Sequence, residues 1–217
     1  MKINENCSIT GKRVILVPYK RHHVLRYHEW MKSAELQELT ASEPLTLDQE
    51  YEMQISWHED EEKLTFIIMD LAKWRNESFT EEDCMCGDVN LFFNNTEDNS
   101  EAEIEIMIAE PSCRGKGYGT EAIFLMMNYG VSHLNLEKIT AKIGFKNVKS
   151  LTLFEELGFT EVSRSEVFQE VTLSLPLTSD IREVISQETA GSQIIEYKPK
   201  RFRYYTGEIF EEKETYC

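Results

Sequence analysis

The sequence predicts a mixed α/β fold, with a central, mostly antiparallel sheet of about seven strands and helices on both of its faces. The first part of the chain supplies hydrophobic segments of strand length that are separated by turn-forming polar residues. The later part changes to the order strand, helix, strand, helix, which is typical of a parallel pair of strands. No segment rich in proline, glycine or serine divides the 217 residues, so one domain is expected.

Seven segments have the composition and spacing of strands. The most regular of them is 101–109, in which Ile104, Ile106 and Ile108 alternate with more polar residues, so one face is predicted to be buried and the other polar. The predicted strands are 13–18, 63–70, 84–93, 101–109, 137–143, 159–162 and 167–175.

Four segments carry apolar residues at helical spacing, and two of them have clear boundary signals. Thr46, followed three residues later by Gln49, has the pattern of a capping box at the start of a helix. Gly158 stands where a glycine commonly follows the end of a helix. The predicted helices are 22–32, 47–57, 119–129 and 147–157, and the polar, acidic segment 70–83 is predicted to be a surface excursion.

The hydrophobic pattern fades beyond residue 177. We therefore expect residues 1–177 to form the folded domain and residues 178–217 to be a disordered C-terminal tail. The tail holds a small basic cluster at 198–203 and an acidic run at 211–214, which are typical of a solvated segment. On this prediction, removing residues 178–217 leaves the domain folded.

The composition excludes several classes of partner. The 39 acidic residues outnumber the 23 Lys and Arg residues, which gives a formal net charge of −16. This charge opposes binding to nucleic acid or to an anionic membrane, and it mildly favours a cationic or amine-bearing substrate. The N-terminal segment lacks the apolar core of a signal peptide, and no stretch reaches the length of a transmembrane helix.

The cysteines and histidines predict neither disulfides nor a metal site. An odd, dispersed set of cysteines in a chain of this size indicates reduced thiols and a cytoplasmic protein. Cys84 and Cys86 are expected on one face of a strand, but no second Cys/His pair completes a zinc site. The cysteines are Cys7, Cys84, Cys86, Cys113 and Cys217, and the histidines, which show no ligand spacing, are His22, His23, His28, His58 and His133.

The most informative segment is 114–120, Arg-Gly-Lys-Gly-Tyr-Gly-Thr, which we call the glycine loop. It lies between the predicted strand 101–109 and the predicted helix 119–129. Three glycines at such a junction leave backbone N–H groups free, and the positive end of the helix dipole adds to them. The loop therefore predicts a phosphate-bearing cofactor.

Two common phosphate motifs do not fit this loop. A Walker loop needs Ser or Thr after its Gly-Lys pair, but Lys116 is followed by Gly117. Residues 117–122 fit the dinucleotide pattern G-x-G-x-x-A. However, that fold needs a preceding strand buried on both faces, and an acidic residue at the end of the next strand, where 142–144 reads Lys-Ile-Gly.

A third pattern, Arg-x-x-Gly-x-Gly, is met by Arg114, Gly117 and Gly119. The segment 147–159 follows at a distance, opening with Asn-x-x-Ser and ending with Leu-Gly-Phe. Together with the strand before the loop, these motifs resemble the acetyl-coenzyme A site of the Gcn5-related N-acetyltransferase (GNAT) family. The resemblance extends over roughly residues 14–175.

The resemblance implies the GNAT fold, in which the strand 101–109 splays away from a parallel neighbour. It implies acetyl-CoA as co-substrate and no metal. The backbone of the splayed strand would pair with the pantetheine arm, a backbone N–H near Ile108 would stabilise the oxyanion, and the glycine loop would hold the pyrophosphate. The cofactor-binding residues implied are Met107, Ile108, Ala109, Arg114, Gly115, Lys116, Gly117, Tyr118, Gly119, Thr120, Asn147, Ser150 and Phe154.

Acetyl transfer to an amine needs a proton acceptor. An N-terminal amine has a pKa of about 8, so part of it is already neutral at physiological pH and the acceptor has only to take one proton. Glu103 and Glu105 point off the apolar face of the strand 101–109 and are the candidate catalytic bases. Glu103 ranks first, because several family members that act on protein amines carry a glutamate at the matching position.

One residue departs from the family pattern. Members often carry a tyrosine, in a Leu-Tyr-Glu sequence, that protonates the leaving thiolate, whereas residues 153–155 here are Leu-Phe-Glu. Because Phe154 cannot donate a proton, Tyr118 or water is the alternative donor. Cys113 lies beside the glycine loop and is expected to be structural, since direct attack by the amine needs no acyl-cysteine.

Together, the segments 29–32, 39–46, 86–92 and 107–117 also resemble a eukaryotic branch of the family that is linked to amino-terminal acetylation of α- and β-tubulin. This resemblance implies a protein N-terminus as acceptor, tubulin as substrate and an effect on microtubule stability. Two other functions stay open. The acidic charge favours a small-amine or polyamine acetyltransferase, and Phe154 favours an acetyl-CoA-binding adaptor with weak catalysis.

Overall fold

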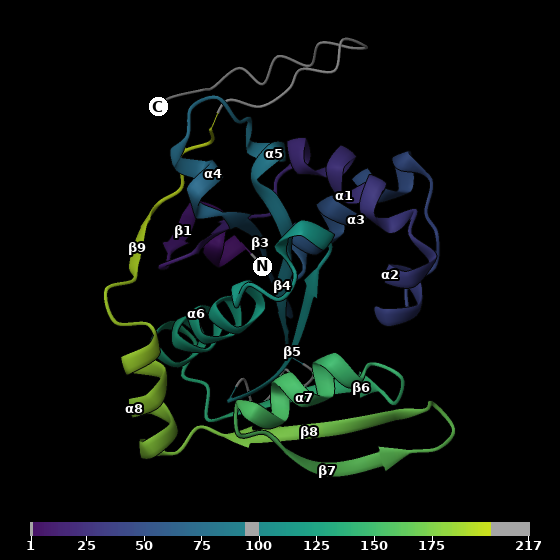
Figure 1. Cartoon of the computed structure of the whole chain (residues 1–217), viewed down its shortest axis with the longest axis vertical. Helices are drawn as coiled ribbons and strands as arrows, with labels where there is room; N and C mark the ends of the chain where they lie inside the picture. Colours follow the sequence, from purple (N-terminus) through teal and green to yellow (C-terminus); the bar gives the residue numbers. More distant parts are fainter. Residues whose placement is uncertain (1, 94–99, 201–217) are drawn as a thin grey trace.

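A nine-stranded sheet forms the centre of the computed structural model, which describes residues 2–93 and 100–200 (Figure 1). The strand order across the sheet is β7-β8-β6-β5-β4-β3-β2-β1-β9. The strands are β1 (Cys7–Thr10), β2 (Val14–Pro18), β3 (Lys63–Asp70), β4 (Met85–Phe92), β5 (Glu101–Ile108), β6 (Lys138–Gly144), β7 (Thr160–Ser165), β8 (Glu170–Pro176) and β9 (Gln193–Glu196). The predicted class, a mostly antiparallel sheet with one parallel pair and flanking helices, is confirmed.

Helices cover both faces of this sheet. The helices are α1 (Val24–Met31), α2 (Ala34–Leu39), α3 (Leu47–Glu59), α4 (Leu71–Arg75), α5 (Glu81–Cys84), α6 (Tyr118–His133), α7 (Val148–Glu156) and α8 (Ser179–Glu188), with 3₁₀ turns η1 (Lys2–Asn4), η2 (Arg21–His23) and η3 (Pro111–Cys113). None of the helices in the described ranges is long and apolar enough to cross a membrane.

The parallel pair β5 and β6 opens into a splay. The two strands pair only over 101–103 and 138–140, although β5 continues to Ile108 and β6 to Gly144. Every other neighbouring pair in the sheet is antiparallel. Beyond residue 103, therefore, β5 is hydrogen-bonded to β4 on one side and separates from β6 on the other.

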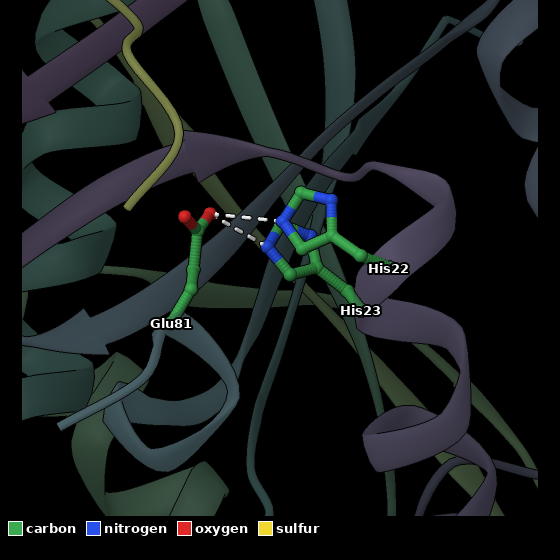
Figure 2. A group of neighbouring side chains, drawn as sticks. All are labelled: His22, His23 and Glu81. Carbon is green, nitrogen blue, oxygen red and sulfur yellow. Dashed lines mark hydrogen bonds and ion pairs between the residues drawn. The ribbon is translucent and has the colours of Figure 1, made fainter. Parts of the chain in front are cut away.

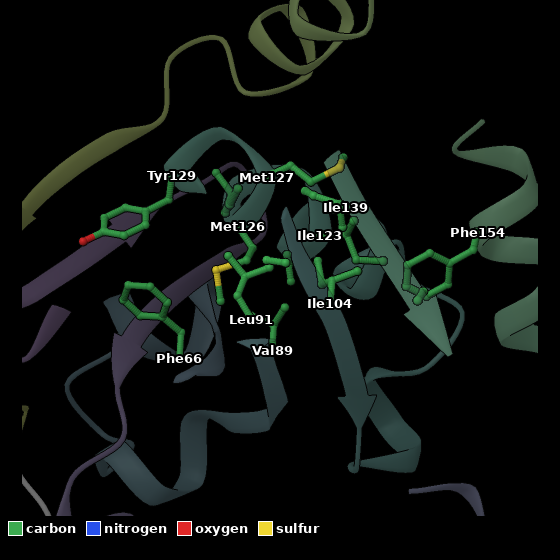
Figure 3. Close-up of a cluster of buried hydrophobic side chains, with 14 of the residues drawn as sticks. Phe66, Val89, Leu91, Ile104, Ile123, Met126, Met127, Tyr129, Ile139 and Phe154 are labelled. Atoms are coloured by element: carbon green, nitrogen blue, oxygen red, sulfur yellow. The ribbon is translucent and has the colours of Figure 1, made fainter. Parts of the chain in front are cut away.

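Alternation along the strands divides the hydrophobic side chains between two cores. One core, which we call the α6 core, lies between the sheet and α6, α7 and α8, and it includes Phe66, Leu91 and Ile104 (Figure 3). The other, the α1 core, lies under α1 and α3 and includes Ile67 and Met107. Because neighbouring residues of a strand point to opposite faces, each central strand contributes to both cores.

Both predicted helix boundaries are confirmed. The Thr46 hydroxyl accepts from the Gln49 N–H at 3.3 Å, and the Gln49 side chain accepts from the Thr46 N–H at 2.9 Å. Gly158 follows α7 with a φ of +91°, a conformation that favours glycine.

The segment 70–83, predicted to be a surface excursion, contains two short helices whose ends are buried. Asp70 accepts from the N–H groups of Ala72 and Lys73 and so caps α4, while Thr80 and Asp83 form a capping box at the start of α5. Helices of four or five residues show too little periodicity to be found from apolar spacing. Cys84 ends α5 and lies in the α1 core, whereas Cys86 lies in the α6 core, so the two thiols are on opposite faces of the sheet.

The prediction that the chain is disordered from residue 178 is wrong for 178–200. Thr178 caps α8, and Ile185 of that helix is buried in the α6 core. After α8, β9 pairs antiparallel with β1 at the edge of the sheet. Residues 201–217 and the predicted turn 94–99 lie outside the described residues.

Candidate active site

The glycine loop leaves a row of backbone donors free at the start of α6. Gly115 and Gly117 have φ angles of +70° and +76°, and Gly117 is the N-cap of the helix. The backbone N–H groups from Gly115 to Thr120 donate no hydrogen bond to another residue in the described part of the chain. Free donors at a helix N-terminus can bind an anion, and the phosphate-binding role of the loop stays a prediction.

Arg114 braces the end of β5. Its Nε donates to the carbonyl oxygen of Ile108 at 2.9 Å, and its Nη2 donates to that of Ala109 at 3.5 Å. Its Nη1 pairs with Glu35 of α2 at 3.0 Å. The guanidinium is thus held by groups of the protein itself, and its role toward a phosphate stays a prediction.

A second arginine, which the sequence analysis missed, lies beside the loop. Nη1 of Arg13, in the turn between β1 and β2, would be 3.9 Å from a Cβ built on Gly117. Lys116 of the loop is exposed. No local pattern links residue 13 to residue 117, because the sheet and α6 bring them together only in the folded chain.

Tyr118 is bound to the protein rather than free to donate to a leaving group. Its hydroxyl donates to Asp70 Oδ2 at 3.0 Å. Desolvation, together with this hydrogen bond to a carboxylate, raises the pKa of Tyr118 to about 12. A hydroxyl that is so weakly acidic is a poor proton donor, which makes water the better alternative.

The splayed end of β5 is closely backed by β4. A Cβ built on Gly87 would lie 1.8 Å from the Met107 carbonyl oxygen, so only glycine permits this approach. Met107 and Ala109 are buried in the α1 core, and Ile108 packs against the α6 core. The three predicted pantetheine-binding residues therefore lie where β5 has left β6.

Glu103 and Glu105 lie on the α1 side of β5 in different surroundings. Glu103 is buried and pairs through Oε2 with Lys142 Nζ of β6 at 2.6 Å, which raises the pKa of Lys142. Glu105 is exposed, yet the protein atoms crowding its carboxyl raise its pKa, and the nearby Glu103 and Asp88 add to the effect. Of the two candidate bases, Glu105 is the more accessible.

A buried polar chain runs beside Glu105, and the sequence analysis did not find it. The Thr65 hydroxyl donates to Asn90 Oδ1 at 2.6 Å, and Asn90 Nδ2 donates to Asp88 Oδ2 at 2.7 Å. Desolvation raises the pKa of Asp88 to about 6. Lys63 of β3 lies on the same face, where desolvation lowers its pKa to about 8. Strand alternation gave the only available signal, since these positions share one face of β3, β4 and β5.

The segment 147–159 follows β6, the strand from which β5 separates, and contains α7. The Asn147 side chain accepts from the Ser150 N–H at 3.2 Å and caps α7, so the Asn-x-x-Ser pattern has a structural use. Phe154 is buried in the α6 core, in an edge-to-face contact with Phe159. Contacts of Asn147, Ser150 and Phe154 with a cofactor stay predictions.

Cys113 is buried directly before the glycine loop. Its Sγ lies 3.0 Å from Sγ of Cys86, and the hydrogen bond from Cys86 lowers the pKa of Cys113 to about 7, against the opposing effect of desolvation. The described cysteines, which are Cys7, Cys84, Cys86 and Cys113, are free thiols.

His22, His23 and Glu81 meet in a separate cluster, where residues of η2 face the start of α5 (Figure 2). Nε2 of His23 and of His22 lie 2.9 and 3.2 Å from Glu81 Oε1. His23 Nδ1 accepts from the Lys20 backbone N–H, so in the neutral ring Nε2 carries the proton and donates to Glu81. The ring nitrogen facing Glu81 is thus a donor and has no lone pair to offer a metal.

Glu81 instead ties the end of the described chain to the domain. Its carboxylate accepts from the Tyr197 hydroxyl at 2.5 Å and from the Lys200 backbone N–H at 2.6 Å. Burial opposes ionisation of Glu81, but the hydrogen bonds from His22 and His23 outweigh it and lower its pKa to about 2. The cluster is a buried hydrogen-bond hub.

This hub predicts a stability loss in mild acid. Desolvation lowers the pKa of His23 from 6.5 to about 4, so between these values the unfolded chain binds more protons than the folded one. The free energy of unfolding should therefore decrease as the pH is lowered, by about 2 kcal/mol from pH 7 to pH 5. Urea unfolding at both pH values measures it.

The matched variants for this test are His23→Gln and His133→Gln. Glutamine at position 23 keeps a donor toward Glu81 but does not titrate, so the stability loss between pH 7 and pH 5 should shrink. His133 is exposed on α6, and its replacement should leave the pH dependence unchanged. An equal pH dependence in His23→Gln would contradict the assignment.

The fold and the loop together define the class of protein. The family model of the acetyltransferase (GNAT) domain matches residues 13–160, which is more than half of the chain. The chain therefore belongs to the GNAT acetyltransferase family.

Among the relatives, the Alpha/beta-tubulin-N-acetyltransferase 9 of Homo sapiens is 54% identical over 203 residues, covering 93% of this chain and 97% of the relative. The protein of the same name from Drosophila melanogaster is 51% identical over 184 residues, covering 83% and 92%.

A solved structure shares the architecture. The spermidine N-acetyltransferase of Vibrio cholerae, in complex with CoA and spermine, matches with a TM-score of 0.63 and 22% identity, over 76% of this chain and 95% of that chain. At this identity, the similarity shows the fold alone.

Proposed function

We propose that the protein transfers the acetyl group of acetyl-CoA to the N-terminal amine of a protein substrate, α- or β-tubulin, and thereby affects microtubule stability. The observation that carries the proposal is the row of free N–H groups at the start of α6, placed next to the opened β5–β6 pair. The names of the relatives support tubulin as the substrate. The free thiols support a cytoplasmic location.

The residues present fit acetyl-CoA. The pyrophosphate would receive hydrogen bonds from the glycine loop, where the start of α6 favours negative charge. The pantetheine arm would lie along β5 where that strand lacks a partner on the β6 side. A backbone N–H near Ile108 would then stabilise the oxyanion.

Glu105 would take the proton of the attacking amine. It is exposed on the α1 side of β5, and a raised pKa makes it a better proton acceptor than an ordinary carboxylate. Glu103, buried and paired with Lys142, would hold β6 near β5 at the point where the two strands separate. Water would protonate the leaving thiolate, because the Phe154 side chain has no acidic proton to donate.

Glu105→Gln is expected to lower kcat about a hundredfold, because the variant cannot accept a proton, and to leave the Kd for acetyl-CoA unchanged. It should also remove the acid limb of the pH profile of kcat/KM. Glu101→Gln, an exposed position on the same face of β5, is the matched control and should keep wild-type kcat. For both variants, steady-state kinetics measure kcat and kcat/KM, and calorimetry measures the Kd for acetyl-CoA. A larger loss of kcat in Glu103→Gln than in Glu105→Gln would assign the base to Glu103.

The proposal is tested by offering acetyl-CoA with tubulin N-terminal peptides, N-terminally blocked lysine peptides and spermidine. Mass spectrometry should locate the acetyl group on the peptide N-terminus. Preferred acetylation of spermidine would overturn the proposal in favour of a polyamine enzyme, which the net charge of −16 favours. Tight acetyl-CoA binding without transfer to any acceptor would indicate the adaptor.

A further inference from the structure

The turn between β1 and β2 places a cation beside the glycine loop. Arg13 Nη1 would be 3.9 Å from a Cβ on Gly117, the N-cap of α6. The Arg13 side chain is 58% exposed, so its donors are open to a ligand that binds at the loop. A guanidinium presents five N–H donors in a planar fork that suits phosphate oxygens.

The backbone of Arg13 is fixed from two sides. Glu121, in the first turn of α6, accepts from the Arg13 N–H at 3.0 and 3.1 Å, and the Arg13 carbonyl accepts from the Leu71 N–H at 2.9 Å. A Cβ built on Gly11 would lie 2.3 Å from Glu121 Oε1, so glycine lets the turn approach α6 without displacing the Glu121 carboxylate. The contacts between the β1–β2 turn and α6 thus fix the position of the Arg13 backbone, from which the guanidinium extends.

The arginine of the loop motif has other partners. Arg114 donates to the carbonyls of Ile108 and Ala109 and pairs with Glu35. Among the described residues, Arg13 has one ion pair, a contact of 3.7 Å with Glu121. A protein with a net charge of −16 needs local positive charge to bind a polyanion. On these contacts, Arg13 is better placed than Arg114 to supply that charge.

Resting on the proposed function, we propose that Arg13 binds a phosphate of acetyl-CoA at the glycine loop and that Arg114 acts as a brace for β5. The site is then assembled from two distant parts of the sequence: backbone donors from 115–120 and a charged side chain from the β1–β2 turn. Arg13 would be a cofactor-binding residue, with no part in the proton transfer.

Calorimetry of the full chain with acetyl-CoA tests the proposal. Arg13→Ala is expected to raise the Kd about tenfold and Arg13→Lys by less, and the effect should weaken at high salt. Lys12→Ala is the matched control, because Lys12 Nζ donates to the Glu188 carbonyl of α8, and its Kd should stay within about twofold of wild type. Thermal melts check that each variant is folded.

Dephospho-CoA, which lacks the 3′-phosphate, identifies the phosphate. A loss of affinity in Arg13→Ala that is equal for CoA and dephospho-CoA assigns the pyrophosphate, and a loss with CoA alone assigns the 3′-phosphate. A wild-type Kd in folded Arg13→Ala overturns the inference. Failure of the wild-type chain to bind acetyl-CoA would instead contradict the proposed function.

Discussion

Gly117→Glu is expected to weaken acetyl-CoA binding by more than a hundredfold. The substitution adds a carboxylate at the N-cap of α6, where free N–H groups and the helix dipole attract an anion. The introduced carboxylate lies close enough to Arg13 to pair with it, and it repels the phosphates of the cofactor. The φ of +76° adds backbone strain of about 1–2 kcal/mol. Calorimetry measures the Kd, and thermal melts measure the strain.

Gly191→Glu is the matched control for charge and strain. Gly191 has a φ of +84°, a Cβ built on it would have no atom within 4 Å, and it lies in the turn between α8 and β9. This variant should lose similar stability and keep the wild-type Kd. Gly117→Ala separates strain from charge, and its Kd should lie much closer to that of wild type. Binding by Gly117→Glu at wild-type strength would rule out the loop as the phosphate site.

Removing residues 178–217 is expected to abolish cooperative folding, contrary to the expectation from the sequence. The deletion removes α8, with its buried Ile185, and β9, which covers the edge of β1. It also removes two of the donors to the buried Glu81 carboxylate, the Tyr197 hydroxyl and the Lys200 N–H. His22 and His23 stay beside Glu81, but each lost hydrogen bond to this buried carboxylate costs about 1–3 kcal/mol, a large part of the stability of a typical domain.

A chain that ends at Lys200 is the control, because it keeps all of these contacts. Its melting temperature should stay near that of the full chain, whereas the chain that ends at Leu177 should show no cooperative transition by circular dichroism. Tyr197→Phe isolates the hydroxyl and should lower the free energy of unfolding by about 1–3 kcal/mol. A stable, cooperatively melting 1–177 fragment would contradict this account.

The parts of the fold that follow a strong local period could be predicted from the sequence. β5 alternates cleanly, and α3 and α7 carry a capping box and a terminal glycine, so their positions were found closely. Strands β1 and β9, at one end of the sheet, have only four residues each, too few for a pattern. For α8 a signal did exist: Thr178 at the cap, followed by Ile181 and Ile185 at helical spacing.

The candidate site shows the same division between local and distant contacts. The glycine loop was found because its donors belong to consecutive residues. Arg13 and the chain from Thr65 to Asp88 were missed, since only strand pairing and the packing of α6 bring them to the site. Arg114 matched its motif, but its contacts with Ile108 and Glu35 depend on α2, which was not predicted.

The contacts of Glu81 also constrain when the protein can fold during synthesis. Glu81 joins η2, near the N-terminus, to Tyr197 and Lys200, and β1 pairs with β9 across almost the whole described chain. Contacts this distant in sequence close large loops and form slowly. During synthesis, the backbone groups on one edge of β1 stay unpaired until β9 has left the ribosome. In that interval the nascent chain is most prone to aggregation.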